Sequence, residues 1–115
     1  MSIAPAHADT FYREVVTSRT VWAIRDASGF PTSTSASGET AMPFWSKEGR
    51  ARAVIEHVAA YAGFSPHPLS LEEFQARWLP GLDRDGIAVG LNWSGERATG
   101  FDVLPQDVLA RLNAS

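Results

Sequence analysis

The sequence contains no cysteine, which excludes disulfide bonds, thiolate metal ligands and thiol catalysis. It also has no apolar run of the roughly 18 to 20 residues that a membrane-spanning helix needs. The first ten residues lack the basic-then-apolar order of a signal peptide. We therefore expect a cytoplasmic protein that does not contact a membrane.

Positive charge is in short supply, because 10 Lys and Arg residues face 13 Asp and Glu residues, giving a net charge of -3. This balance provides no general attraction to a phosphate backbone, so nucleic acid is not an expected partner. A length of 115 residues and a hydrophobic content of 44% are typical of one folded globular domain. We expect a single domain over residues 1–115, in which residues 1–8 lie loosely on the surface.

The first half of the chain predicts one helix followed by strands. Apolar residues at helical spacing predict a helix from Asp9 to about Ser18. Residues 21–26 are rich in β-branched and aromatic side chains, and the short turn after them predicts a hairpin with residues 31–35 as an edge arm. Residues 40–45 follow as a third strand.

A second helix is expected after Ser46, whose hydroxyl can cap its first turn. Arg52 and Glu56 have the spacing of an i, i+4 ion pair on its outer face. Gly63 and the proline-containing segment 65–68 should end it. Its buried stripe is expected to comprise Ala51, Val54, Ile55, Val58 and Tyr61 or Ala62.

A third helix and a strand are predicted between residues 70 and 93. Ser70 and Glu73 form a capping-box pattern, and Pro80-Gly81 should break or kink the helix that they begin. Gly86 then releases the chain into a strand. Large apolar residues alternate along that strand and should share one face, at Ile87, Val89, Leu91 and Trp93.

A hairpin through residues 94–96 should bring Phe101 and Val103 back beside this strand, and Pro105 is well placed to start a terminal helix. The predicted order is therefore α-β-β-β-α-α-β-β-α. This order favours an α+β fold in which an antiparallel β-sheet is packed on one face by helices.

The most specific segment of the sequence is Trp78-Leu79-Pro80-Gly81-Leu82 followed by Asp85-Gly86. Through this segment and other positions the chain resembles the domain-of-unknown-function 2750 family of small bacterial proteins. Phe44 and Ser46 depart from the family pattern, where a smaller aliphatic residue and a proline are expected. The resemblance implies one compact bacterial domain with no assigned activity, so it supplies no catalytic residue. Its other positions are Phe11, Val15, Val21-Trp22, Asp26, Gly29, residues 42–45, Leu69, Leu71 and Phe74.

Sequence patterns for catalysis or metal binding are weak. His7, His57 and His67 do not cluster, and residues 83–85 with Glu96 lack the spaced oxygen ligands of an EF-hand loop. The hydroxyl-rich run 28–37 has no nucleophile-elbow context and is interpreted as hairpin surface. No catalytic residue, metal or cofactor is therefore predicted.

One candidate binding site lies around the start of the second helix and comprises Trp45, Ser46, Lys47, Arg50 and Trp93. Free amides at a helix N-terminus and two nearby cations can attract a small anion. The two tryptophans, near element ends, are the aromatic residues best placed to reach a partner. The simpler explanation is a Ser-capped helix, with Glu48 competing for the amides and the tryptophans packed in the core.

Two functions follow as hypotheses. The first is a non-enzymatic binding or interaction protein with an unidentified protein partner, for which a toxin-neutralising or immunity-like role is one concrete form; a homodimer is compatible with it. The alternative is a small enzyme or binding protein for a phosphorylated or carboxylated metabolite. Lys47 and Arg50 would then hold the anion, with His57 or Asp85 as the acid-base group.

Overall fold

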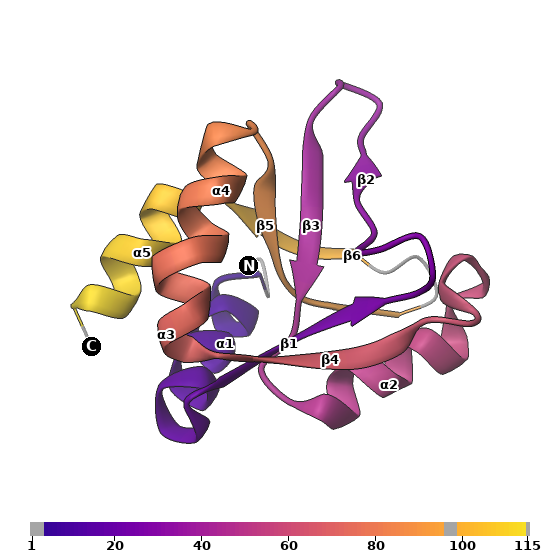
Figure 1. Cartoon of the computed structure of the whole chain (residues 1–115), viewed down its shortest axis with the longest axis horizontal. Coiled ribbons are helices and arrows are strands. Elements are labelled where there is room, and N and C mark those ends of the chain that lie inside the picture. The colour runs from indigo at the N-terminus through magenta and orange to yellow at the C-terminus, as the bar shows by residue number, and fades with distance from the viewer. Residues whose placement is uncertain (1–3, 96–98, 115) are drawn as a thin grey trace.

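The computed structural model describes residues 4–95 and 99–114 and confirms the α+β class (Figure 1). The strands are β1 (Thr20–Arg25), β2 (Ser33–Thr34), β3 (Thr40–Phe44), β4 (Ser65–Ser70), β5 (Ala88–Ser94) and β6 (Thr99–Val103). The helices are α1 (Ala4–Ser18), α2 (Glu48–His57), η1 (Ala59–Tyr61), α3 (Leu71–Glu73), η2 (Phe74–Trp78), α4 (Leu79–Arg84) and α5 (Pro105–Asn113).

The strands form two sheets that meet at one point. In the larger sheet the order is β2-β3-β5-β6, with β3 and β5 parallel and the outer pairs antiparallel. The smaller sheet is the antiparallel pair β1-β4, which crosses the end of β3 in Figure 1. Backbone hydrogen bonds of 2.8 and 2.7 Å between Trp22 and Trp45 join the two sheets.

The predicted hairpin between residues 21–26 and 31–35 is wrong, because β1 pairs with β4 instead. The bend after β1 closes with a single bridge between Asp26 and Gly29, and the short β2 lies at the edge of the other sheet. β4 was expected to be a helix-ending loop because it contains Pro66 and Pro68. Proline lacks a backbone N–H donor. Prolines at alternate positions of a strand face the same edge, and a two-stranded sheet has an open edge where no such donor is needed.

Two helix starts also differ from the predictions. α1 begins at Ala4 rather than Asp9, so residues 4–8 are helical and Ala8 is buried. α2 begins at Glu48 with Lys47 as its N-cap residue, and no side chain caps it. Arg52 bonds to Glu48, one turn back along the helix, instead of to Glu56.

The third predicted helix runs without a break across the proline. The Ser70 hydroxyl accepts a 3.0 Å bond from the Glu73 amide, as the capping-box pattern predicts. The expected break at Pro80 is absent among the described residues 71–84, which form consecutive helical segments. A wider turn with i to i+5 bonds over Phe74–Trp78 directly precedes the proline, and such turns absorb a local mismatch in a helix. Gly86, at φ +70°, then ends the helix as expected.

Two apolar clusters form the core. The larger cluster joins α1, α3, α4 and α5 to the four-stranded sheet around Phe11, Phe44 and Phe74. The smaller one lies between α2 and strands β1, β4 and β5, and it contains Trp45 and Trp93. The second cluster therefore forms the base of the region in which the binding site was predicted.

Candidate functional site

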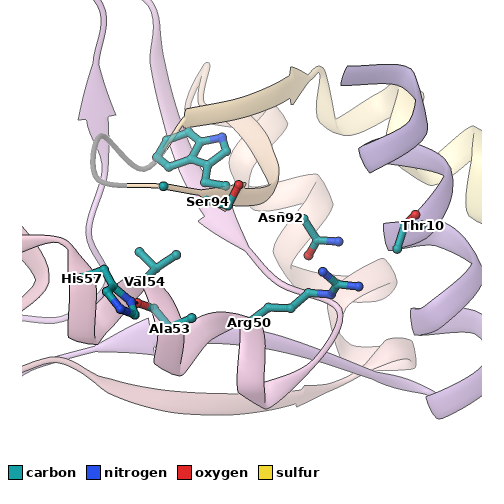
Figure 2. A pocket seen from close by; sticks show the side chains of 9 residues that line it. Thr10, Arg50, Ala53, Val54, His57, Asn92 and Ser94 are labelled. Atoms are coloured by element: carbon teal, nitrogen blue, oxygen red, sulfur yellow. The ribbon is translucent and has the colours of Figure 1, made fainter. Parts of the chain in front are cut away.

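A cavity of about 450 Å³ lies between α2 and the end of β5. This volume falls within the usual range for a small-molecule site. Figure 2 shows α2 along one side of the cavity and β5 along the other, with α1 at one end. The residues that line it are Thr10, Arg50, Ala53, Val54, His57, Asn92, Trp93, Ser94 and Gly95.

Helix α2 provides one wall of this cavity. Arg50, Ala53, Val54 and His57 follow one another at intervals of three, one and three residues, which places them on one face of a helix. Figure 2 shows Arg50 and His57 at opposite ends of this row. The wall is therefore apolar in the middle and polar at both ends.

A β-bulge shapes the opposite wall. The β5-β6 register passes from Leu91 opposite Phe101 to Ser94 opposite Thr99, so Asn92 and Trp93 together face one residue of β6. Asn92 adopts a left-handed φ of 51°. The extra residue reverses the alternation, which places Trp93 on the other face of the strand from Leu91.

The position of the Trp93 ring confirms this reversal. A Cβ atom added at Gly90 would lie only 2.3 Å from Cε2 of Trp93, so the indole covers the side of β5 that carries Gly90. The prediction that Trp93 shares a face with Val89 and Leu91 is wrong, because strict alternation does not continue through a bulge.

Both tryptophans of the predicted site belong to the core. Trp45 has 0% and Trp93 has 5% of its surface exposed. Nε1 of Trp45 donates a 2.8 Å bond to the Trp93 carbonyl, and Nε1 of Trp93 donates a 2.8 Å bond to Oδ1 of Asp102. Trp45 is thus a structural residue, whereas Trp93 also lines the cavity.

A polar network connects Asn92 to Arg50 behind the cavity wall. The Asn92 amide accepts a 2.9 Å bond from the Ser46 backbone and donates a 3.0 Å bond to the Ser46 hydroxyl. That hydroxyl donates to Oε1 of Glu14 at 2.6 Å, and Glu14 accepts two bonds from Arg50, at 3.0 and 3.2 Å. Ser46 is 1% exposed and does not line the cavity, so it connects the network rather than acting as a nucleophile.

Glu14 occupies the place where an external anion was predicted. Its carboxylate also lies 3.6 Å from Nζ of Lys47, so two cations surround one anion. Burial raises the pKa of Glu14, but hydrogen bonds from Arg50 and Ser46 and the charges of Arg50 and Lys47 together lower it. No local sequence pattern marks Glu14, because it lies more than thirty residues from its partners.

The remaining candidates divide between the cavity and other places. His57 lines the cavity, and its Nδ1 lies 2.7 Å from the Ala53 carbonyl. Asp85 lines a separate groove beside Trp78, and His67 packs against the ring of Phe30. The structure therefore brings Arg50 and His57 together and leaves Asp85 elsewhere.

Two predicted candidates cannot be placed. The side chain of His7 and the whole of Glu96 lie outside the described part of the chain. Across residues 4–95 and 99–114, no three His, Asp or Glu side chains form a group that could hold a metal ion. None of the helices in those ranges combines the length and apolar character that crossing a bilayer requires.

Comparison with known proteins establishes the family of the chain. A search of curated proteins finds no match. The family model described as "Protein of unknown function (DUF2750)" matches residues 8–112, which is nearly the whole sequence. The resemblance noted from the Trp-Leu-Pro-Gly-Leu segment is thereby confirmed, and the chain belongs to the DUF2750 family.

Proposed function

We propose that this protein is a non-enzymatic binding protein that holds a small organic anion, phosphorylated or carboxylated, in the cavity between α2 and β5. One observation supports this most: a single concave site joins the cation of Arg50 to an apolar surface made by Val54 and Trp93. Ligand sites commonly combine an apolar lining with a few fixed polar groups.

Arg50 keeps the capacity to bind an anion although it pairs with Glu14. A guanidinium group has five N–H donors, and its bonds to Glu14 use Nε and one N–H of Nη2. Arg50 and Asn92 both line the cavity and are linked through Ser46 and Glu14, and Figure 2 draws them toward the same end of it. An anionic group bound there would meet donors from both residues.

A large apolar protein interface has less support. Leu104, at 54%, is the one large hydrophobic side chain that is strongly exposed within the described residues. Protein interfaces usually have an apolar core of several such side chains. A protein partner, a toxin-neutralising role and a homodimer therefore remain predictions from sequence, as does the cytoplasmic location.

A second candidate function uses the same cavity for catalysis. Arg50 would hold an anionic substrate, and His57 would act as its acid-base group at the far end of the wall. The observation that favours it is the presence of both residues in one cavity. A His57→Gln variant that binds an anionic metabolite but no longer converts it would support this function, whereas unchanged conversion would oppose it.

The binding proposal is tested by filling the cavity. Ala53 is an exposed helical residue on the cavity wall, so Ala53→Leu adds volume there with little cost to the helix. Ala110 is an exposed residue of α5 outside the cavity, and Ala110→Leu is the matched control.

The probes are benzoate and phenyl phosphate, with benzyl alcohol as a neutral comparison, and the measurement is the change in ¹H–¹⁵N chemical shifts. We expect at least one anionic probe at millimolar concentration to shift the amides of residues 50–57 and 92–95. Ala53→Leu should abolish these shifts and Ala110→Leu should preserve them. The proposal is wrong if neither anion shifts these amides, or if both variants respond equally.

A further inference from the structure

The ligand-facing donors at the Arg50 end of the cavity are fixed by the network behind them. The Ser46 backbone N–H can only donate, so it sets Oδ1 of Asn92 as the acceptor and leaves Nδ2 as the donor. One N–H of Nδ2 bonds to the Ser46 hydroxyl. The other has no partner within the described residues, although Asn92 is only 6% exposed and lines the cavity. This N–H is therefore a donor that a ligand oxygen in the cavity can accept from.

The charge at this end matches a single negative charge. Lys47 and Arg50 supply two positive charges and Glu14 one negative charge, which leaves a net charge of about +1 by this count. A carboxylate would balance it. A phosphate dianion would bring excess negative charge to a guanidinium that already binds Glu14 at 3.0 and 3.2 Å, which is electrostatically unfavourable.

The other end of the cavity offers polar groups of a different kind. Nδ1 of His57 lies 2.7 Å from the Ala53 carbonyl, which can only accept, so Nδ1 donates this bond and Nε2 is the ring nitrogen left for a ligand donor. Ser94 adds a hydroxyl from the opposite wall. A ligand group that donates a hydrogen bond, such as a hydroxyl, fits these partners.

The helix sets the distance between the two ends. Arg50 and His57 are seven positions apart on α2, and at about 1.5 Å per residue their backbones are separated by about 10 Å. Ala53, Val54 and Trp93 line the space between them. This middle section is apolar and suits a ring.

We infer that the cavity binds a monocarboxylic acid with a ring-sized apolar body and a hydroxyl-type donor at its far end. This inference rests on the proposed function and makes it more specific. The carboxylate bonds to Arg50 and Asn92, the ring packs against Val54 and Trp93, and the far donor bonds to His57.

The probe for this inference is 3-(4-hydroxyphenyl)propanoate. Three comparison compounds change one feature each: its propanamide removes the charge, 3-phenylpropanoate removes the far hydroxyl, and 2-(4-hydroxyphenyl)ethyl phosphate replaces the carboxylate with a phosphate. Dissociation constants come from the same amide shifts. We expect the acid to bind at least tenfold more tightly than the amide and the phosphate, and about threefold or more tightly than 3-phenylpropanoate.

Three variants assign the two ends of the ligand. His57→Phe should remove the preference for the hydroxyl and keep the preference for the acid over the amide. Arg50→Lys keeps the charge but loses the planar fork, so it should weaken the acid about fivefold or more and leave the amide unchanged. Arg52→Gln removes a positive charge from the same helix outside the cavity and should leave the ranking intact.

Failure of this inference can be separated from failure of the proposed function. Tighter binding of 2-(4-hydroxyphenyl)ethyl phosphate than of the acid, or a hydroxyl preference that survives in His57→Phe, would overturn the inference while the cavity still binds an anion. Absence of shifts in residues 50–57 and 92–95 with every anion would overturn the proposed function as well.

Discussion

Gly90→Ala tests the bulge that places Trp93 on the cavity wall. The added methyl group would lie 2.3 Å from Cε2, 2.4 Å from Nε1 and 2.6 Å from Cζ2 of the buried Trp93 ring. The ring also lies close to Gly100, where an added Cβ would be only 2.7 Å from its Cδ1, so the β6 backbone leaves the indole little room to shift. The substitution therefore forces either local repacking or expulsion of the indole.

The destabilisation caused by Gly90→Ala is set by whichever of these two responses costs less free energy. Repacking an overfilled core costs about 1–3 kcal/mol. It also strains or breaks the 2.8 Å bond from Trp93 to Asp102, and a bond to a charged group contributes about 1.5–3 kcal/mol. Expelling the ring would expose about 150–250 Å² and cost about 4–6 kcal/mol. Replacing a glycine in a strand by alanine stabilises the folded state by about 0.5–1 kcal/mol, which offsets part of this cost. We therefore expect Gly90→Ala to lower the free energy of unfolding by about 2–4 kcal/mol.

The assay is urea unfolding, with Gly49→Ala as the matched control. Gly49 lies in the first turns of α2 with nothing within 4 Å of an added Cβ, so this change should stabilise the protein slightly. Gly90→Ala should lower the unfolding midpoint at an unchanged slope. A Trp93→Leu background should reduce its cost, because the colliding ring is gone. If Gly90→Ala unfolds within about 0.5 kcal/mol of the wild type, the placement of Trp93 on this face is wrong.

Three further predictions concern the polar groups around this wall. Ser46→Ala should cost about 1–3 kcal/mol in urea unfolding, since it removes the hydroxyl that bonds both Asn92 and Glu14; a neutral result would contradict the network. The folded-state pKa of Glu14 is lowered, so its stabilising contribution is present at neutral pH and is lost as the pH falls through that pKa. The difference in unfolding midpoint between wild type and Glu14→Gln should thus be larger at pH 7 than at pH 3. Burial raises the pKa of Asp102 against the opposing bond from Trp93, so its ionisation opposes folding as the pH rises. Asp102→Asn should therefore stabilise the protein more at pH 7 than at pH 3, and the opposite trend would refute the assignment.

Local sequence patterns correctly predicted those helices and strands that form through interactions between residues close in the sequence. The capping pattern of Ser70 and Glu73 marks a true helix start, and Pro105 begins α5, because both effects act within one turn of a helix. The same holds for the β5-β6 hairpin, whose strands are close in sequence. These features needed no information about the rest of the fold.

The features that sequence patterns missed depend on partners far along the chain. The segment containing Pro66 and Pro68 reads as a loop, and only β1, some forty residues earlier, makes it a strand. Serine is a common N-cap residue, yet the hydroxyl of Ser46 bonds to Glu14 of α1 and Asn92 of β5. Tertiary contacts therefore overrode a local preference in both cases.

The structure brings two residues of the predicted site together, and the reason is physical. Arg50 and Trp93 do line one cavity, because α2 packs against β5. The nature of the site could not be read from the pattern around Lys47, since the carboxylate of Glu14 approaches from a different helix. A cluster of positive charge in sequence becomes a nearly balanced network in the fold.

Residue 92 shapes the cavity wall that β5 forms. Its left-handed φ of 51° lies in the bulge that places Trp93 on the α2 side of the strand, and its side chain bonds to Ser46 and lines the cavity. Glycine at this position would allow the left-handed backbone conformation but would lose the side-chain hydrogen bonds to Ser46. Aspartate would place a second negative charge in the network that contains Glu14. Asparagine satisfies both demands, because it tolerates the left-handed region and carries both a donor and an acceptor. The left-handed backbone and the proposed ligand donor thus belong to one residue, which ties the fold of β5 directly to the site.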